Sequence, residues 1–314
     1  MFVSLVFSCL MNSSIGESSI AYQGLPGRVS RLPRQPVVSE TIYIADKGAQ
    51  RIVKLDNLSG AGWATLTANT LGLGTLPVSS VAVDKQGKIY FCAAGKVHRV
   101  NNIAGQGHVS MNLPSNAGVD NQVYVRSNGW VYVTVGTNQV IAYDTVGASA
   151  VQKWQVTHSG SPTPPSDLFV DSAGTVTLAT ETVISGGNSS QYPGIILEIQ
   201  SNSTVPVSFF PVQDLRGVTR DSGGRIYFAT KNGIVRMNNI SGAGQSLMST
   251  TNPVVGCALA SSKIITLMPS GGKVGALSLT PNNSQSWFGS LGTGVNQYSS
   301  PVDVCVYAFN TNAL

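Results

Sequence analysis

Charged residues are scarce in this chain of 314 residues. They make up 11% of it, against about 25% in a typical soluble domain, and glutamate occurs only at Glu17, Glu40, Glu181 and Glu198. The net charge of +5 therefore reflects the scarcity of glutamate more than a basic surface. A nucleic-acid-binding surface needs clustered lysine and arginine with aromatic residues. The repeated segments of the chain contain no such cluster, so we expect no nucleic-acid partner.

Cysteine is also rare, and the chain has no long hydrophobic run. Cys9, Cys92, Cys257 and Cys305 form no C-x-x-C pair, so the spacing does not indicate a paired-thiol site. We expect buried free thiols; the alternative is a Cys257–Cys305 disulfide, which would have to span two sheets. The apolar run at residues 3–10 is shorter than the roughly 20 residues that cross a bilayer. The sequence therefore predicts no transmembrane span.

Residues 1–36 differ from the rest of the chain. No lysine or arginine precedes the apolar run, although a secretory signal carries a basic segment there, so a signal segment and a disordered tail both stay open. Residues 22–36 contain three prolines and Arg28, Arg31 and Arg34, which would lie on one side of an extended segment. This segment is either a solvated linker or an assembly contact with an acidic partner or membrane surface. We expect a tail over 1–36 and one domain over 37–314.

What the chain does have is one segment written several times. Residues 42–63 read IYIADKGAQRIVKLDNLSGAGW, residues 89–108 read IYFCAAGKVHRVNNIAGQGH, and residues 226–245 read IYFATKNGIVRMNNISGAGQ. Fainter copies have their equivalent first residue at Val131, Val176 and Ile264. The six copies are separated by 47, 42, 45, 50 and 38 residues. A period in the forties is typical of four-stranded propeller blades.

Each repeat is predicted to form four short strands. The first is an apolar run such as residues 81–83, followed by a polar turn that closes on Gly87, Gly129, Gly174 or Gly224. Glycine suits these turns because it tolerates positive φ, and aspartate starts them by bonding its own backbone. The second strand is the β-branched and aromatic run IYF or VYV, and the third is RIVKL, VHRV, QVIAY or GIVRM. A glycine-rich turn then leads to the fourth.

The two ends of the chain are expected to complete each other. The first repeat lacks an opening strand, whereas residues 300–308, SPVDVCVYA, resemble an opening strand with no repeat behind it. Pairing these ends makes one blade from both termini and leaves no exposed sheet edge. The predicted fold is therefore all-β: a six-bladed β-propeller of four-stranded blades, closed by a C-terminal strand that joins the N-terminal blade.

The D-x-x-G-x-I-Y-h-A runs, together with the R-I-V-K or H-R-V strands that follow them, resemble NHL-repeat β-propellers. The resemblance covers about residues 37–309 and implies the same six-bladed fold. It leaves the function open, because one fold hosts many functions.

The residues expected around the central channel are the first candidates for a site. Counting back from the turns aligns a channel ring of Ser80, Gln122, Asp167, Gly217, Gly256 and Asp303. Asp167 and Asp303 fall in opposite blades. Together with Gln122 and backbone carbonyls, they are candidate ligands of a hard divalent cation such as calcium. The alternative is that each aspartate only accepts hydrogen bonds from nearby backbone amides.

Four further residues are candidate ligand contacts at the channel mouth. Glu181 and Tyr192 belong to a long insertion at residues 181–194, between the second and third strands of the fourth repeat. An insertion in one repeat maps to one face, often the binding face, although Gly- and Ser-rich insertions are tolerated almost anywhere. Of the three histidines, only His158 is expected near the mouth, and Arg216 directly precedes the ring residue Gly217.

The sequence favours a non-catalytic module that binds a protein or small molecule, secreted or at the cell surface, with no certain cofactor. Propeller lyases that inactivate streptogramins or amidate peptides rely on histidines, but His98 and His108 are expected away from the channel. Lactonases resembling regucalcin use glutamate, asparagine and aspartate around a metal, and the channel ring has no glutamate. No G-x-S-x-G motif occurs. The alternative is a metal-dependent lyase or lactonase that uses Asp167, Asp303 and His158.

Overall fold

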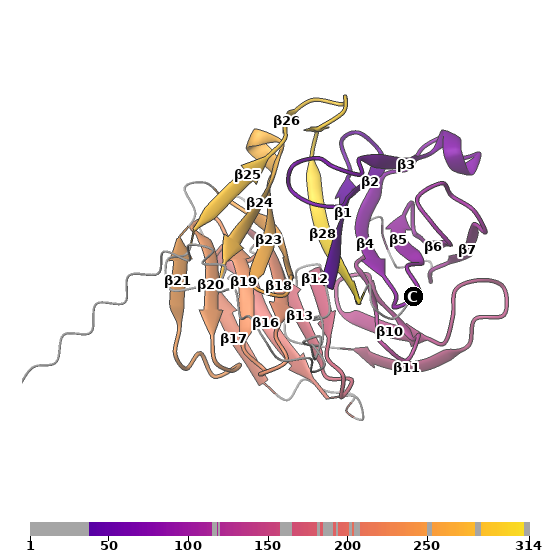
Figure 1. Cartoon of the computed structure of the whole chain (residues 1–314). Helices are drawn as coiled ribbons and strands as arrows, with labels where there is room; N and C mark the ends of the chain where they lie inside the picture. The colour runs from indigo at the N-terminus through magenta and orange to yellow at the C-terminus, as the bar shows by residue number, and fades with distance from the viewer. Residues whose placement is uncertain are drawn as a thin grey trace, which may run out of the picture. The chain divides into compact units, whose positions relative to one another are not determined.

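The chain divides into two units, Met1–Pro36 and Val37–Leu314. The computed structural model describes residues 38–114, 118, 120–157, 165–180, 183–184, 191–192, 194–200, 203, 208–249, 253–279 and 284–310. All of them belong to the second unit, which is nearly all β-structure (Figure 1).

Six four-stranded antiparallel sheets form the six blades of a β-propeller. In chain order, blade 1 holds β28 (Pro301–Asn310), β1 (Val38–Asp46), β2 (Arg51–Leu55) and β3 (Ala64–Thr67). Blade 2 holds β4 (Val78–Val83), β5 (Ile89–Ala93), β6 (Lys96–Val100) and β7 (Val109–Asn112). Blade 3 holds β8 (Val123–Val125), β9 (Val131–Val135), β10 (Gln139–Tyr143) and β11 (Gln152–Thr157).

The second half of the chain supplies the other three blades. Blade 4 holds β12 (Pro165–Val170), β13 (Val176–Thr180), β16 (Gly194–Ile199) and β17 (Ser208–Val212). Blade 5 holds β18 (Gly217–Arg220), β19 (Ile226–Thr230), β20 (Gly233–Met237) and β21 (Ser246–Ser249). Blade 6 holds β22 (Val255–Leu259), β23 (Lys263–Met268), β24 (Lys273–Ser278) and β25 (Gln285–Phe288). The predicted fold class is confirmed.

Two two-stranded sheets and two 3-10 helices lie outside the six blade sheets in the described part of the chain. The pair β14 (Val183–Ile184) and β15 (Gln191–Tyr192) lies within the predicted long insertion of blade 4, and β26 (Ser290–Leu291) pairs in parallel with β27 (Gln297–Tyr298). The described residues contain two short 3-10 helices, η1 (Asn69–Leu71) and η2 (Pro269–Gly271). No helix in this part of the chain is long and apolar enough to cross a membrane.

The turns between first and second strands form as predicted. Asp84 Oδ1 accepts hydrogen bonds from the backbone N–H groups of Gln86 and Lys88, each at 2.9 Å, while Oδ2 accepts one from the Tyr90 hydroxyl at 3.0 Å. Gly87 closes the turn with φ of 79°, which glycine adopts without steric cost. The D-x-x-G-x-I-Y run is thus a turn joined to a strand by its own aspartate.

Blade 1 is closed by the two ends of the propeller, as the sequence predicts. In Figure 1, β28 (yellow) lies beside β1 (indigo), and the two strands pair antiparallel from Val38 opposite Asn310 to Asp46 opposite Pro301. A buried aspartate reinforces the closure. The Asp46 carboxylate accepts hydrogen bonds from the N–H groups of Ser299 and Ser300 and from Arg51 Nε at 3.2 Å. The segment that leads into β28 is therefore held to blade 1.

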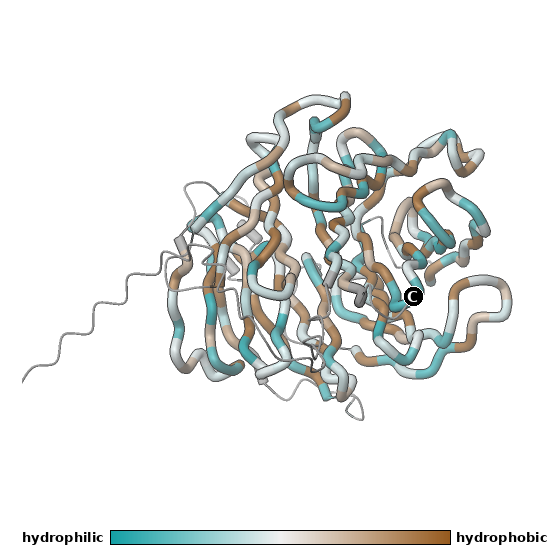
Figure 2. Tube along the Cα trace, viewed as in Figure 1, coloured by the Kyte–Doolittle hydropathy of each residue, from teal (hydrophilic) through white to brown (hydrophobic). Residues whose placement is uncertain are grey.

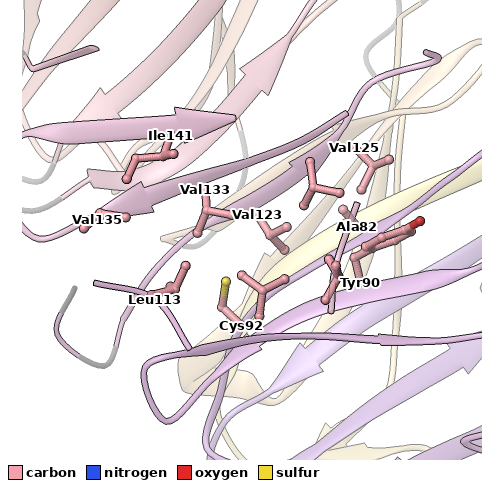
Figure 3. Packing of buried hydrophobic residues seen from close by; sticks show 12 residues of the cluster. Ala82, Tyr90, Cys92, Leu113, Val123, Val125, Val133, Val135 and Ile141 are labelled. Carbon is pink, nitrogen blue, oxygen red and sulfur yellow. The ribbon is translucent and has the colours of Figure 1, made fainter. Parts of the chain in front are cut away.

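The core lies between neighbouring blades. The second strands β5, β9, β13 and β19 are buried along their whole length, because successive side chains point to opposite faces of a sheet and both faces are covered here. Hydrophobic residues, brown in Figure 2, lie along many of the strands. Between blades 2 and 3, for example, Val123, Val125 and Val133 pack against Tyr90 and Cys92 (Figure 3). Fully burying a side chain of this size contributes about 1.5–3 kcal/mol.

Candidate functional site

The innermost strands of the six blades surround a central cavity. Its volume is about 250 Å³, and β28, β4, β8, β12, β18 and β22 all contribute lining residues. Most of the lining is aliphatic, and the carboxylates of Asp167 and Asp303 are the acidic groups among the lining residues. We call this space the inner cavity.

The six residues of the channel ring lie at the level where the innermost strands begin. Asp167 and Asp303 face equivalent positions of their second strands, Ala179 and Ala45. Neighbouring blades come very close at the two ring glycines: a Cβ atom on Gly217 would lie 2.8 Å from the Cα atom of Gly256. Gly256 itself has φ of 63°. A side chain at Gly217 would push blades 5 and 6 apart, so glycine serves close approach there. At Gly256 a Cβ atom would meet nothing closer than 3.5 Å, so glycine serves the backbone conformation instead.

Asp303 connects blade 1 to blade 2. Its Oδ2 atom accepts hydrogen bonds from Ser80 Oγ at 2.8 Å and from the backbone N–H of Val81 at 2.9 Å. Its Oδ1 atom accepts one from the N–H of Val304 at 2.7 Å. Ser80 Oγ in turn accepts a hydrogen bond from the N–H of Val123, at 3.0 Å, which extends the connection into blade 3.

Asp167 connects blade 4 to blade 5 in the same way, in the opposite half of the ring. Its Oδ2 atom accepts a hydrogen bond from the N–H of Val218 in blade 5 at 2.8 Å, and its Oδ1 atom accepts one from the N–H of Leu168 at 2.7 Å. Both aspartates therefore accept backbone hydrogen bonds, which is the alternative that the sequence left open.

Neither carboxylate has a positively charged partner among the described residues. Burial raises the pKa of Asp303 to about 6, against the hydrogen bonds from Val81 and Ser80 that lower it. Burial, and secondly the charge of Asp303, raise the pKa of Asp167 well above its ordinary value. Both carboxylates line the inner cavity. Burying a charged carboxylate without a cationic partner destabilises the folded state. The Asp167 and Asp303 pair is therefore electrostatically unusual within the described structure.

A second pocket, here called the mouth pocket, opens at the other side of the channel ring. Its volume is also about 250 Å³. Its lining residues are Lys47, Ser79, Asp120, Gln122, Pro165, Ser166, Arg216, Val255, Pro269, Ser300, Pro301 and Val302. All six blades contribute, through the starts of their innermost strands, the residues just before them, and loops between second and third strands. This is the face on which the sequence placed the candidate site.

Two polar groups of the mouth pocket are unsatisfied. Gln122 is only 7% exposed, and its Oε1 atom is buried without a hydrogen-bond partner, as is Ser166 Oγ. Lys47, by contrast, forms an ion pair with Asp120. Buried polar groups are normally hydrogen-bonded in native proteins, and an unmatched one calls for an explanation. Ser166 was missed by the sequence analysis, although it directly precedes the ring residue Asp167.

The histidines and cysteines do not assemble a catalytic centre in the part of the chain that the structure describes. His98 and His108 lie in blade 2, where His98 Nδ1 and His108 Nε2 are 3.0 Å apart. Cys92, Cys257 and Cys305 are free thiols, and burial raises the pKa of Cys305 to about 12. The alternative of a Cys257–Cys305 disulfide is therefore wrong. Among the described residues, no group of three or more His, Cys, Asp or Glu side chains could hold a metal ion.

Several predicted residues fall outside the described part of the chain. His158, Glu181, Arg28, Arg31 and Arg34 are among them. Tyr192 is described only as part of the strand β15. Of the other mouth candidates, the structure places Gln122 and Arg216 in the mouth pocket and Asp167 and Asp303 in the inner cavity, on the two sides of the channel ring.

Comparison with known proteins identifies the fold. No protein-family model and no curated protein matches the chain. Among solved structures, a chain of a nidogen/laminin complex has a TM-score of 0.63 at 9% identity, covering 85% of this chain and 98% of that one. A streptogramin B lyase has a TM-score of 0.57 at 16% identity, with coverages of 87% and 84%. Virginiamycin B lyase from Staphylococcus aureus has a TM-score of 0.54 at 16% identity, with coverages of 79% and 80%. At these identities the likeness supports the β-propeller fold alone.

Proposed function

We propose that this protein is a non-catalytic, NHL-like binding module whose ligand enters the mouth pocket. The observation that carries the proposal is the unsatisfied Gln122 Oε1 atom, buried in the wall of a pocket to which all six blades contribute. Leaving such a group unpaired costs about 1–3 kcal/mol. A ligand that donates a hydrogen bond to it recovers that free energy on binding.

A thermal-shift screen of small molecules, with the full chain, tests this proposal. We expect hits that raise the melting temperature of the wild type and lose at least tenfold in affinity in Gln122→Leu, which keeps the side-chain size and removes the amide. Gln86→Leu is the matched control, because Gln86 lies in the turn at the other end of β4. Hits that bind both variants equally well would contradict a ligand at Gln122.

The place of action and the partner are part of the same proposal. The low charge content, 11% of residues, fits a secreted or cell-surface protein, and Arg28, Arg31 and Arg34 would form a contact with an acidic partner or a neighbouring subunit. Size-exclusion chromatography of the chain with and without residues 1–36 tests the contact. We expect the shortened chain to elute with fewer subunits per particle than the full chain. An unchanged number of subunits would contradict the contact.

A lyase or lactonase acting at the same mouth is the second candidate function. Two buried carboxylates with raised pKa values facing a channel are the observation that favours it, since perturbed carboxyl groups in a cleft are common at catalytic sites. His158 would be a further catalytic group and a divalent cation such as calcium a cofactor. Turnover of a streptogramin B or a lactone with Ca²⁺ or Mg²⁺, abolished in Asp167→Asn, is the expected result; no turnover removes this candidate.

A further inference from the structure

A third pocket, here called the turn pocket, lies at the end of the innermost strands that is opposite the channel ring. It is formed by the turns between first and second strands of blades 3, 4 and 5. Tyr124, Phe169 and Arg220 line both this pocket and the inner cavity. Its volume is about 370 Å³, and small-molecule sites commonly measure about 300–1,000 Å³. The propeller therefore has a second pocket of suitable size, at the other end of its innermost strands from the mouth pocket.

Arg126, which lines the turn pocket, departs from the repeat. In blade 2 the first residue of the corresponding turn is Asp84, whose Oδ2 atom accepts a hydrogen bond from the Tyr90 hydroxyl at 3.0 Å, and blade 5 has the same pair at 3.2 Å. Blade 3 keeps the tyrosine, as Tyr132, but has Arg126 in place of the aspartate. The turn of blade 3 therefore brings a positive charge where the turns of blades 2 and 5 bring a negative one.

Asp171, in blade 4, departs from the repeat in the opposite way. Blade 4 keeps the turn aspartate but has Thr177 in place of the tyrosine. Asp171 Oδ1 accepts a hydrogen bond from the N–H of Thr175 at 2.9 Å, whereas its Oδ2 atom has no hydrogen-bond partner among the described residues. The Thr177 hydroxyl instead accepts a hydrogen bond from Arg220 Nη1 at 3.4 Å. One oxygen of the Asp171 carboxylate is therefore left for a ligand.

Arg126 and Asp171 lie close together without pairing. Arg126 Nη2 donates a hydrogen bond to the carbonyl oxygen of Ser172, the residue after Asp171, so the guanidinium reaches the turn of blade 4. Its other neighbour is Tyr132: burial raises the pKa of that hydroxyl, against the hydrogen bond and the charge of Arg126, which lower it. Arg126 and Asp171 are both half-buried, and neither forms an ion pair with a described residue. The turn pocket thus holds one unpaired charge of each sign.

The remaining charged residues of the turn pocket are already paired. Arg220 Nη1 lies 3.0 Å from Glu198 Oε2, and Asp221 Oδ2 lies 2.6 Å from Arg225 Nε. A ligand therefore meets one free cation and one free anion. A ligand with a single charge would leave the other protein charge unmatched, whereas a zwitterion matches both.

We infer that the turn pocket binds a free amino acid with a hydrophobic side chain, its carboxylate on Arg126 and its ammonium group on Asp171. Guanidinium N–H groups form charge-assisted hydrogen bonds with carboxylates, and an ammonium group offers three N–H donors to the free Oδ2 atom. Because Arg126 Nε is buried without a partner, the two terminal nitrogens are the donors offered to the ligand. The site is separate from the mouth pocket, so the inference does not rest on the proposed function.

A hydrophobic side chain is expected because an aromatic pair accompanies the two charges. Tyr124 and Arg126 are two residues apart in blade 3, as are Phe169 and Asp171 in blade 4. The two rings meet edge to face, with centroids 5.2 Å apart. Both aromatic residues are half-buried, although the residues that flank them on both strands are buried. Covering the open parts of these rings removes apolar surface from water, which favours binding.

Calorimetric titration of the full chain with L-phenylalanine at pH 7.5, where both of its end groups are charged, tests the inference. The comparison compounds are N-acetyl-L-phenylalanine, which lacks the ammonium group, L-phenylalaninamide, which lacks the carboxylate, and glycine, which lacks the hydrophobic side chain. We expect L-phenylalanine to bind at least tenfold more tightly than each of them. This comparison uses the wild type alone, so it does not depend on the folding of any variant. A comparison compound that binds as tightly as L-phenylalanine, or no saturable binding of L-phenylalanine, would overturn the inference.

Variants then locate the site. Arg126→Gln and Asp171→Asn should each weaken L-phenylalanine binding at least tenfold, and asparagine keeps the Oδ1 acceptor for the N–H of Thr175. Lys85→Gln is the matched control, because Lys85 is an exposed cation in the corresponding turn of blade 2, and its affinity should stay within about twofold of the wild type. Unchanged affinity in both pocket variants, or an equal loss in the control, would overturn the site. If L-phenylalanine binding is instead lost in Gln122→Leu alone, the proposed function stands and the turn-pocket site falls.

Discussion

At the scale of single residues, the two buried aspartates show how one side chain holds two blades together. Asp303 ties blade 1 to blade 2 through Ser80 and Val81, and Asp167 ties blade 4 to blade 5 through Val218. The two positions lie in opposite blades. The same two carboxylates are also the candidate binding residues. A substitution at either position would therefore affect both the contact between blades and any ligand binding.

His98 supplies a residue-scale prediction about pH. Its ring is buried, stacks on Phe91 with centroids 4.8 Å apart, and its pKa is lowered to about 4, chiefly by burial and secondly by the charge of His108. His98 becomes protonated below about pH 6.5 in the unfolded chain but only below about pH 4 in the folded protein. The folded state is therefore destabilised as the pH falls through this window, by on the order of 2 kcal/mol at pH 4.5.

Urea unfolding at pH 7 and pH 4.5 checks this prediction. In His98→Phe the loss of unfolding free energy between the two pH values should shrink by about that amount, whereas the more exposed His108 should matter less in His108→Phe. Asp303 acts in the opposite direction, because its raised pKa of about 6 makes its contribution fall as the pH rises from about 4 to 6. Its effect is common to wild type and variant and cancels in the comparison. An unchanged loss in His98→Phe would contradict the assignment to His98.

At the scale of elements, the turn between third and fourth strands is built around a glycine pressed against a polar side chain. Gly244 has φ of 64°, and a Cβ atom there would lie 2.2 Å from Nδ2 of Asn238. Gly107 faces Asn101 and Gly62 faces Asp56 in the same way in blades 2 and 1. The second glycine of the repeated Gly-x-Gly therefore suits its backbone conformation, and a side chain there would also displace a neighbouring polar side chain.

Gly244→Ala and Gly224→Ala separate these two requirements. Gly224 also has positive φ, 82°, but a Cβ atom there would meet nothing within 4 Å. We expect Gly224→Ala to cost about 1–2 kcal/mol from backbone strain alone, and Gly244→Ala to cost more, because Asn238 must also move. Thermal or urea unfolding measures both, and equal losses would show that the contact carries no cost.

At the scale of the whole propeller, closure through blade 1 predicts how the protein unfolds. Deleting residues 300–314 removes β28, which supplies the innermost strand of blade 1 and Asp303. It exposes the edge of β1 and opens the channel ring. We expect loss of the cooperative unfolding transition and of the compact state, and partial recovery when a synthetic peptide of residues 299–310 is added. Unchanged cooperative unfolding of the shortened chain would contradict closure as the source of stability.

The sequence by itself determined the repeating parts of this protein. Strand order, the starts of the second strands and the turn aspartates with their glycines follow from local patterns: alternation, β-branched residues and tolerance of positive φ. Closure by residues 300–308 follows from comparing the repeats, because the first repeat lacks an opening strand. The level of the channel ring was also predictable, because each repeat fixes the same register. These turn and strand patterns each involve residues close together in the chain, so they can be recognised from the sequence alone.

Only the tertiary structure decided what the candidate site residues contact. That Asp303 reaches Ser80 and Asp167 reaches Val218, and that Gln122 Oε1 is left without a partner, depends on how innermost strands of different blades approach each other. The close approach of Gly217 to Gly256, between blades 5 and 6, is a further contact of this kind. These partners are separated by tens to hundreds of residues, and no local pattern in the sequence encodes the distance between them.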